Sequence, residues 1–118
     1  MTVHTDSRII AAPLDEVFAL VADVERYPDF LPLWREAEIV RRWDGGYETQ
    51  QVIGLGPIRE RFNTHTVLLP PSQIEVTSDD RLFRTFFIRW DFAVVPRGCR
   101  TGIALQWEVG SPRLQRAI

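Results

Sequence analysis

The sequence is short of the residues that support disulfide, redox or metal chemistry. Its 118 residues include one cysteine, Cys99, which excludes an internal disulfide. The two histidines, His4 and His65, are far apart in the chain and have no cysteine or second histidine at the spacing of metal ligands. We therefore predict neither a metal site nor a bound cofactor.

Long apolar runs and an excess of charge are also missing. No apolar run approaches the roughly 18 residues that span a bilayer. The N-terminus lacks the basic region and apolar core of a signal peptide, so we expect a cytoplasmic protein. The net charge is −2, which argues against a dedicated nucleic-acid binder, and every basic side chain is arginine. The length fits one domain over residues 1–118.

No set of side chains predicts catalysis. Asp79 and Asp80 fall in a predicted turn, where aspartate is favoured for backbone hydrogen bonding. We assign Glu48 and Glu60 to outward faces of strands. Because no nucleophile, base or carboxylate pair converges, we name no catalytic residue.

The most informative stretch is residues 83–95. Phe86, Ile88, Trp90, Phe92 and Val94 alternate with a mixed set that includes Arg89 and Asp91. Strict alternation over about ten residues is typical of a half-buried strand in an antiparallel sheet. The aromatic face must be covered, either by a helix or by a ligand between helix and sheet.

The chain before this strand predicts one helix and several more strands. Residues 3–11 alternate as a first strand, and Pro13 begins a helix with Leu14, Val17, Phe18 and Val21 on one face. The helix should weaken by Asp23, with a short helical turn at Tyr27-Pro28. The loop that follows carries Phe30, Leu31, Leu33 and Trp34, either as a plug for the core or as the rim of a pocket.

From Glu36 the sequence reads as strands joined by turns. Ala37, Ile39, Arg41 and Trp43 alternate as one face, up to the hairpin signal Asp44-Gly45-Gly46. Further strands are expected over residues 47–55, 58–69, 73–78, 83–95 and 101–109. Ser111-Pro112 then starts a helix with Leu114 and Ile118 on one face. We predict an α+β fold in which a curved antiparallel sheet of about six to seven strands surrounds helices.

Several motifs in this order resemble a known superfamily. They are Ile9-x-Ala-Ala-Pro13, Val17-Phe18, Leu20-Val21, Asp23-Val24, Tyr27-Pro28-x-Phe30-Leu31-Pro32, Phe62-x-Thr64, Leu69-Pro70-Pro71-x-x-Ile74, Phe83-Arg84 and Trp90-x-Phe92. Together they resemble the START-like helix-grip superfamily (SRPBCC), and within it the coenzyme Q-binding and polyketide cyclase/dehydrase branch that includes RatA-type proteins. The resemblance implies a long C-terminal helix gripped by the sheet, with an apolar cavity between them. The chain ends after the first turn of that helix, so we expect a helix that is truncated after Ser111.

The resemblance implies binding of a hydrophobic small molecule, such as a quinone, polyprenyl or other lipid, by a carrier rather than a catalyst. The expected cavity residues are Phe18, Val21, Phe30, Trp34, Phe62, Thr64, Ile74, Phe86, Trp90, Phe92 and Trp107. For any one of these residues, plain core packing is the competing interpretation.

Two alternatives stay open at this point. A polyketide cyclase/aromatase would act by shaping its substrate and needs few diagnostic side chains. A RatA-type protein would contact the ribosome and block association of its subunits, and a basic strip could then meet RNA phosphates. The candidates for that strip are Arg41, Arg42, Arg59, Arg61, Arg84 and Arg89. Among partners, we also expect transient membrane contact and a homodimer through the uncovered sheet face, but no DNA.

Overall fold

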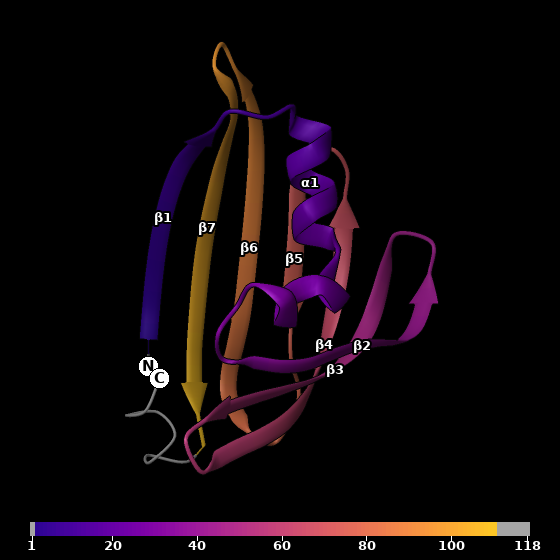
Figure 1. Cartoon of the computed structure of the whole chain (residues 1–118). Helices are drawn as coiled ribbons and strands as arrows, with labels where there is room; N and C mark the ends of the chain where they lie inside the picture. Colours follow the sequence, from indigo (N-terminus) through magenta and orange to yellow (C-terminus); the bar gives the residue numbers. More distant parts are fainter. Residues whose placement is uncertain (1, 111–118) are drawn as a thin grey trace.

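A curved, seven-stranded antiparallel sheet forms most of the molecule (Figure 1). The computed structural model describes residues 2–110. The strand order is β1-β7-β6-β5-β4-β3-β2, so β1 (Thr2–Ile10) and β2 (Trp34–Trp43) are the two edges. The strands between them are β3 (Gly46–Leu55), β4 (Ile58–Leu69), β5 (Gln73–Thr77), β6 (Phe83–Val95) and β7 (Gly98–Val109).

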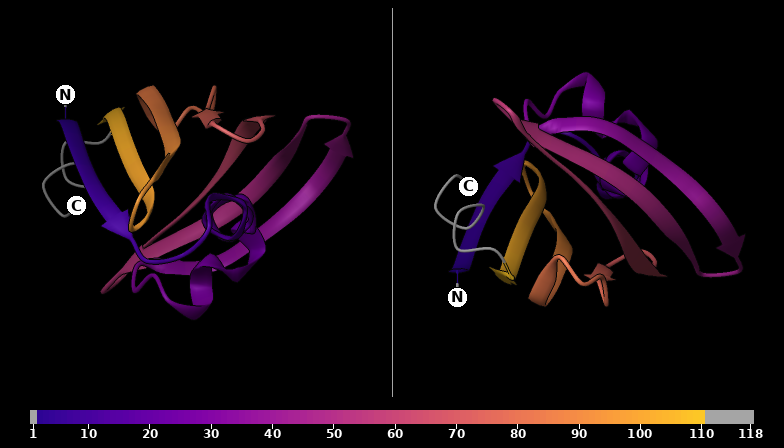
Figure 2. Two further views of the ribbon diagram at one scale, coloured as in Figure 1. Left: turned by 90° about the horizontal axis from the view of Figure 1, so that it is seen from above. Right: turned by 90° about the horizontal axis from the view of Figure 1, so that it is seen from below.

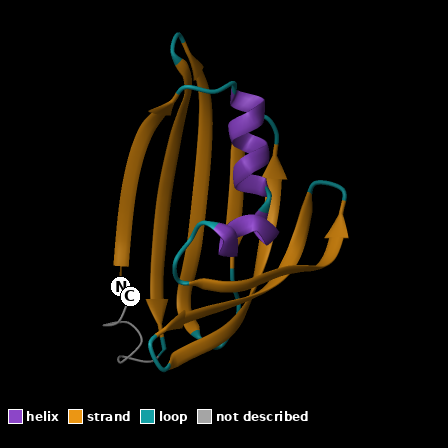
Figure 3. Ribbon diagram, viewed as in Figure 1, coloured by secondary structure: helices purple, strands orange, loops and turns teal. Residues whose placement is uncertain are grey.

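Two short helices lie on the inner face of this sheet (Figures 2 and 3). Helix α1 (Leu14–Ala22) follows Pro13 and carries Asp15 and Glu16 in its first turn, where acidic groups are favoured by the helix dipole. A 3-10 helix, η1 (Val24–Asp29), follows it and packs beside β2. Within residues 2–110, no helix is long and apolar enough to cross a membrane.

The core centres on the contact between α1 and the sheet. Val17 of α1 packs with Ile74, Phe92 and Cys99, all nearly inaccessible to solvent. The ring of Phe18 meets that of Phe92 edge to face, with centroids 5.4 Å apart. Such ring pairs add about 0.5–1.5 kcal/mol beyond the burial of their surface.

The sequence prediction of the fold is confirmed in outline. Seven antiparallel strands form the expected curved sheet, α1 and η1 lie where the helix and the short helical turn were predicted, and both β4 and β6 begin and end at the predicted residues. The hairpin turn also forms, with Gly45 at φ 86°, a conformation that glycine adopts at no steric cost. The predicted helix from Ser111 lies outside the described residues.

Three local predictions were wrong. Trp34 is the first residue of β2 rather than part of the loop. A bulge between Ile39 and Arg41 moves Arg41 and Trp43 to the face opposite Ile39, because a bulge shifts the alternation by one residue. Glu60 has the same parity as Phe62 in a strand of regular register, and it therefore shares the inner face.

Candidate ligand-binding site

The inner face of β6 and β7 carries a continuous apolar surface. The register pairs Phe86 with Trp107, Ile88 with Leu105 and Trp90 with Ile103. These side chains are half-buried, in contrast to the buried residues under α1. Helix α1 contacts both strands, and the core residues Phe92 and Cys99 mark where it lies. The inner face therefore continues beyond the helix as a partly accessible apolar wall.

The structure brings most of the predicted cavity residues into two groups on this face. Phe18, Val21 and Trp90 pack against the core cluster that contains Ile74 and Phe92. In the second group, Phe62 contacts Phe86 at 6.3 Å between ring centroids, and the ring of Phe83 contacts both of these rings. Phe83 was not among the predicted residues, although it starts the aromatic strand.

The remaining aromatic candidates lie at the edges of these groups. Phe30 is 53% exposed and contacts Tyr27 edge to face at 5.9 Å. Trp34 is half-buried and also contacts the ring of Tyr27 edge to face, with the ring centroids 6.5 Å apart. Trp107 is half-buried, and its indole N–H has no hydrogen-bond partner among the described residues.

A buried strip of neutral polar side chains lies on the inner face of β3 and β4. The Gln51 side-chain N–H groups donate to the hydroxyls of Thr49, at 2.9 Å, and Thr64, at 3.2 Å. The two hydroxyls are 2.6 Å apart, and the Trp34 indole N–H donates to the Gln51 carbonyl oxygen at 2.6 Å. Each group thus has a partner, which is the condition for burying polar atoms without a large cost.

Sequence reasoning found Thr64 of β4 but missed Thr49 and Gln51 of β3. One face of β3 carries Tyr47, Thr49 and Gln51, each two residues from the next. This period-two pattern was available from the sequence. Polar residues in a strand are usually assigned outward, and nothing local shows that β3 turns this face toward the core. The pairing of β3 with β4 places Thr49 opposite Thr64, and this pairing is what assigns Thr49 and Gln51 to the inner face.

Two tyrosine hydroxyls hydrogen-bond to the carbonyl groups at the C-terminal end of α1. Tyr47 donates to the carbonyl of Ala22 at 2.8 Å, and Tyr27 donates to the carbonyl of Val21. These carbonyls belong to the last turn of the helix, which lacks intrahelical partners for them. Burial raises the pKa of Tyr47 to about 12, and burial likewise raises the pKa of Tyr27. Both tyrosines are neutral hydrogen-bond donors at physiological pH.

These features suit retention of an apolar molecule. The buried polar side chains of the inner face are threonines and a glutamine, none of which carries a charge. Among residues 2–110, no group of three or more His, Cys, Asp or Glu could hold a metal ion. An apolar wall with a few neutral polar groups resembles the general composition of small-molecule sites.

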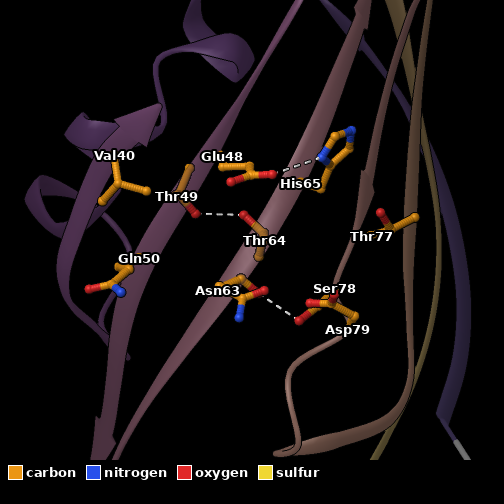
Figure 4. A pocket seen from close by; sticks show the side chains of 10 residues that line it. All are labelled: Val40, Glu48, Thr49, Gln50, Asn63, Thr64, His65, Thr77, Ser78 and Asp79. Carbon is orange, nitrogen blue, oxygen red and sulfur yellow. Dashed lines mark hydrogen bonds and ion pairs between the residues drawn. The ribbon is translucent and has the colours of Figure 1, made fainter. Parts of the chain in front are cut away.

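A separate pocket of about 600 Å³ lies mainly against the outer face (Figure 4). It is lined by Val40, Glu48, Thr49, Gln50, Asn63, Thr64, His65, Thr77, Ser78 and Asp79. The Glu48 carboxylate lies 2.9 Å from Arg41 and 3.6 Å from His65, and the Ser78 hydroxyl donates to the Asn63 carbonyl at 2.6 Å. Because this pocket is lined mostly by polar groups, it suits an apolar ligand less well than the inner face.

The basic residues singled out from the sequence do not form a single strip. Arg41, Arg59 and Arg89 pair with Glu48, Glu36 and Glu75, at 2.9, 3.2 and 3.5 Å. Arg42 lies over the ring of Tyr47, which belongs to the inner face. Arg61 hydrogen-bonds Gln50 at 3.3 Å, and Arg84 is exposed on β6.

The chain is similar to two kinds of characterised protein. It is 26% identical over 120 residues to the ribosome association toxin RatA of Pseudomonas aeruginosa, covering 100% of this chain and 83% of RatA. It is 23% identical over 113 residues to the mitochondrial coenzyme Q-binding protein COQ10 of Drosophila melanogaster. That alignment covers 92% of this chain but 47% of the relative, so the chain spans under half of its length.

Solved structures show the same fold. A protein from Thermus thermophilus has a TM-score of 0.84 at 21% identity, covering 98% of this chain and 82% of that one. The Zhui aromatase/cyclase of a Streptomyces species has a TM-score of 0.80 at 16% identity, covering 93% and 69%. A START superfamily protein from Mycobacterium smegmatis has a TM-score of 0.78 at 20% identity, covering 93% and 79%. A family model described as polyketide cyclase/dehydrase and lipid transport matches residues 10–118, and the chain belongs to that family.

Proposed function

We propose that the chain binds a hydrophobic small molecule against the inner face of the sheet and holds it without transforming it. One observation carries this proposal: the aromatic face of β6 and β7 continues from half-buried Trp90, which borders the core under α1, to half-buried Phe86 and Trp107. Such a surface gains free energy when an apolar molecule covers it, at roughly 25 cal/mol per Å² removed from water. A ligand that covered about 100 Å² would gain about 2.5 kcal/mol by this rule.

The ligand class that we propose is a quinone, a polyprenyl chain or a comparable lipid. The family includes lipid transport, and one relative is named for coenzyme Q binding. An isoprenoid chain would lie along the apolar wall, and a flat ring would lie against the half-buried ring of Phe86. The absence of charge from the buried polar strip favours a neutral ligand over a carboxylate or a phosphate.

The loop after η1 is the proposed entrance. Trp34 is held by its hydrogen bond to Gln51, whereas Phe30 is mostly exposed and is held by a ring contact with Tyr27. Displacement of Phe30 would therefore break few contacts, while Trp34 would remain bound to the buried polar strip.

Organic extraction of the purified protein, followed by mass spectrometry, tests the proposal. We expect an isoprenoid or other lipid at near-stoichiometric amount, and much less of it in extracts of Trp90→Asp, which places a charge on the wall. Val94→Asp is the matched control, because Val94 is 77% exposed on the same strand. An empty extract, followed by no binding of added quinone to folded protein, would contradict the proposal.

Contact with the ribosome is a second candidate. Its support is the similarity to RatA, which extends over 83% of that protein. The ion pairs of Arg41, Arg59 and Arg89 with glutamates reduce the positive potential of the outer face. Sedimentation with separated ribosomal subunits at physiological salt tests this function, and binding that survives only at low salt would count against it.

A further inference from the structure

The two edges of the sheet are protected to different degrees. At β2, the register shifts twice, between Trp34 and Glu36 and between Ile39 and Arg41. The Ile39 backbone N–H donates to the Glu25 carboxylate at 3.0 Å, and η1 packs beside the strand. Bulges and a covering element are usual devices that stop an edge strand from pairing with another chain.

Neither of these devices protects β1 within the described residues. Its nine residues pair with β7 in unbroken register from Thr2–Trp107 to Ile10–Cys99, without a proline or a bulge. The residues from Val3 to Ile10 are all exposed. In the part of the chain that the structure describes, the sheet ends at this strand (Figure 1). A long, regular and exposed edge is a template for an added strand.

One hydrogen bond shows which backbone groups face outward. The Ser7 N–H donates to the carboxylate of Asp6 at 2.8 Å instead of to β7, so it points to the free edge. In a strand, backbone groups of alternate residues point the same way, and Thr5 and Ile9 therefore share this direction. These three residues can exchange hydrogen bonds with an incoming antiparallel strand.

We propose that β1 pairs antiparallel with β1 of a second copy of this chain, with the two-fold axis at Ser7. Ser7 then lies opposite Ser7, and Thr5 lies opposite Ile9, so that outward-facing backbone groups meet. On the inner face, Asp6 of each copy lies opposite Arg8 of the other, which gives two reciprocal ion pairs. The interface is isologous, and it joins two seven-stranded sheets into one.

Charge selects this register over its neighbours. An axis at Asp6 would place the two Asp6 carboxylates opposite each other, and like charges directly opposite are destabilising. An axis at Thr5 would leave Arg8 opposite Thr2 without a carboxylate. Within one chain, the Arg8 guanidinium already lies 3.3 Å from Asp6, so dimerisation exchanges this contact for one between copies.

Sedimentation velocity over a concentration series, with a charge-swap set, tests the proposal. We expect Arg8→Asp to raise the dimer dissociation constant at least about tenfold, equivalent to about 1.4 kcal/mol. The double variant Asp6→Arg/Arg8→Asp should restore dimerisation, because it re-creates opposite charges in the same register. Arg100→Asp is the matched control, since Arg100 is exposed on the neighbouring strand β7 and should leave the dimer unchanged.

A backbone variant separates edge pairing from other modes of association. Ser7→Pro removes an N–H that β7 does not use, and proline is tolerated on edge strands when its missing N–H faces outward. We expect a folded monomer, with folding checked by circular dichroism. A chain that stays monomeric up to about millimolar concentration, the range of weak complexes, would overturn the proposal. A dimer that ignores Arg8→Asp or is not restored by the charge swap would also overturn it.

Discussion

Under α1, Phe92 of β6 is 4% exposed and packs against Val17 and Phe18, whereas Phe86 and Trp90 on the same face of the same strand are half-buried. The two ends of this face have similar side chains. They differ in cover, because Phe92 is fully enclosed in the cluster under α1, Trp90 borders that cluster and Phe86 is not part of it. An aromatic residue at the covered end is part of the core, and one at the open end can serve a ligand.

The largest effect is expected at the covered end. Phe92→Ala should lower the free energy of unfolding by about 3–5 kcal/mol, because it removes a buried ring and its contact with Phe18. Urea denaturation measures this loss. Val94→Ala, two residues along the same face but 77% exposed, should change stability by less than about 0.5 kcal/mol. Equal losses for the two variants would show that α1 does not seal this end.

The polar strip allows a sharper comparison, between the two faces of one strand. Gln51→Leu should cost about 1–3 kcal/mol, because the Trp34 N–H and the two threonine hydroxyls lose a buried partner. Gln50→Leu makes the same chemical change one residue away, at an exposed position on the opposite face. It should cost less than about 0.5 kcal/mol, and a similar cost for both would mean that the strip is not a buried network.

At the open end, the effect should appear in binding more than in stability. Trp90→Ala should weaken binding of a quinone probe by about tenfold or more, equivalent to about 1.4 kcal/mol, because the ring forms part of the accessible wall. Its cost in unfolding free energy should be smaller than that of Phe92→Ala. Titration calorimetry and urea denaturation measure the two quantities on the same protein. A large loss of stability with unchanged affinity would assign Trp90 to the core.

The sequence predicted the helices and strands far better than it predicted which of their residues other elements bury. Period-two alternation and turn residues predicted the first and last residues of β4 and β6 correctly, because these signals are local. The bulge after Ile39 and the inward face of Thr49 and Gln51 depend on how β3 pairs with β2 and β4, which no local pattern reveals. The predicted cavity list therefore mixed core residues such as Phe92 with accessible ones such as Trp90.

A last effect concerns the hydroxyls that hold the end of α1, and it appears only as a dependence on pH. The pKa of Tyr47 is raised from its ordinary value of 10 to about 12 by burial, so the folded state favours the neutral phenol. Its contribution to stability is complete below about pH 10 and is lost between about pH 10 and 12, because the unfolded chain releases this proton first. Urea midpoints measured from about pH 9 to 12 should therefore fall less steeply in Tyr47→Phe than in the parent protein. The only other tyrosine, Tyr27, also has a raised pKa, so the double variant Tyr27→Phe/Tyr47→Phe should fall less steeply still. An unchanged slope in Tyr47→Phe would mean that water reaches this hydroxyl and that α1 covers its end of the sheet loosely.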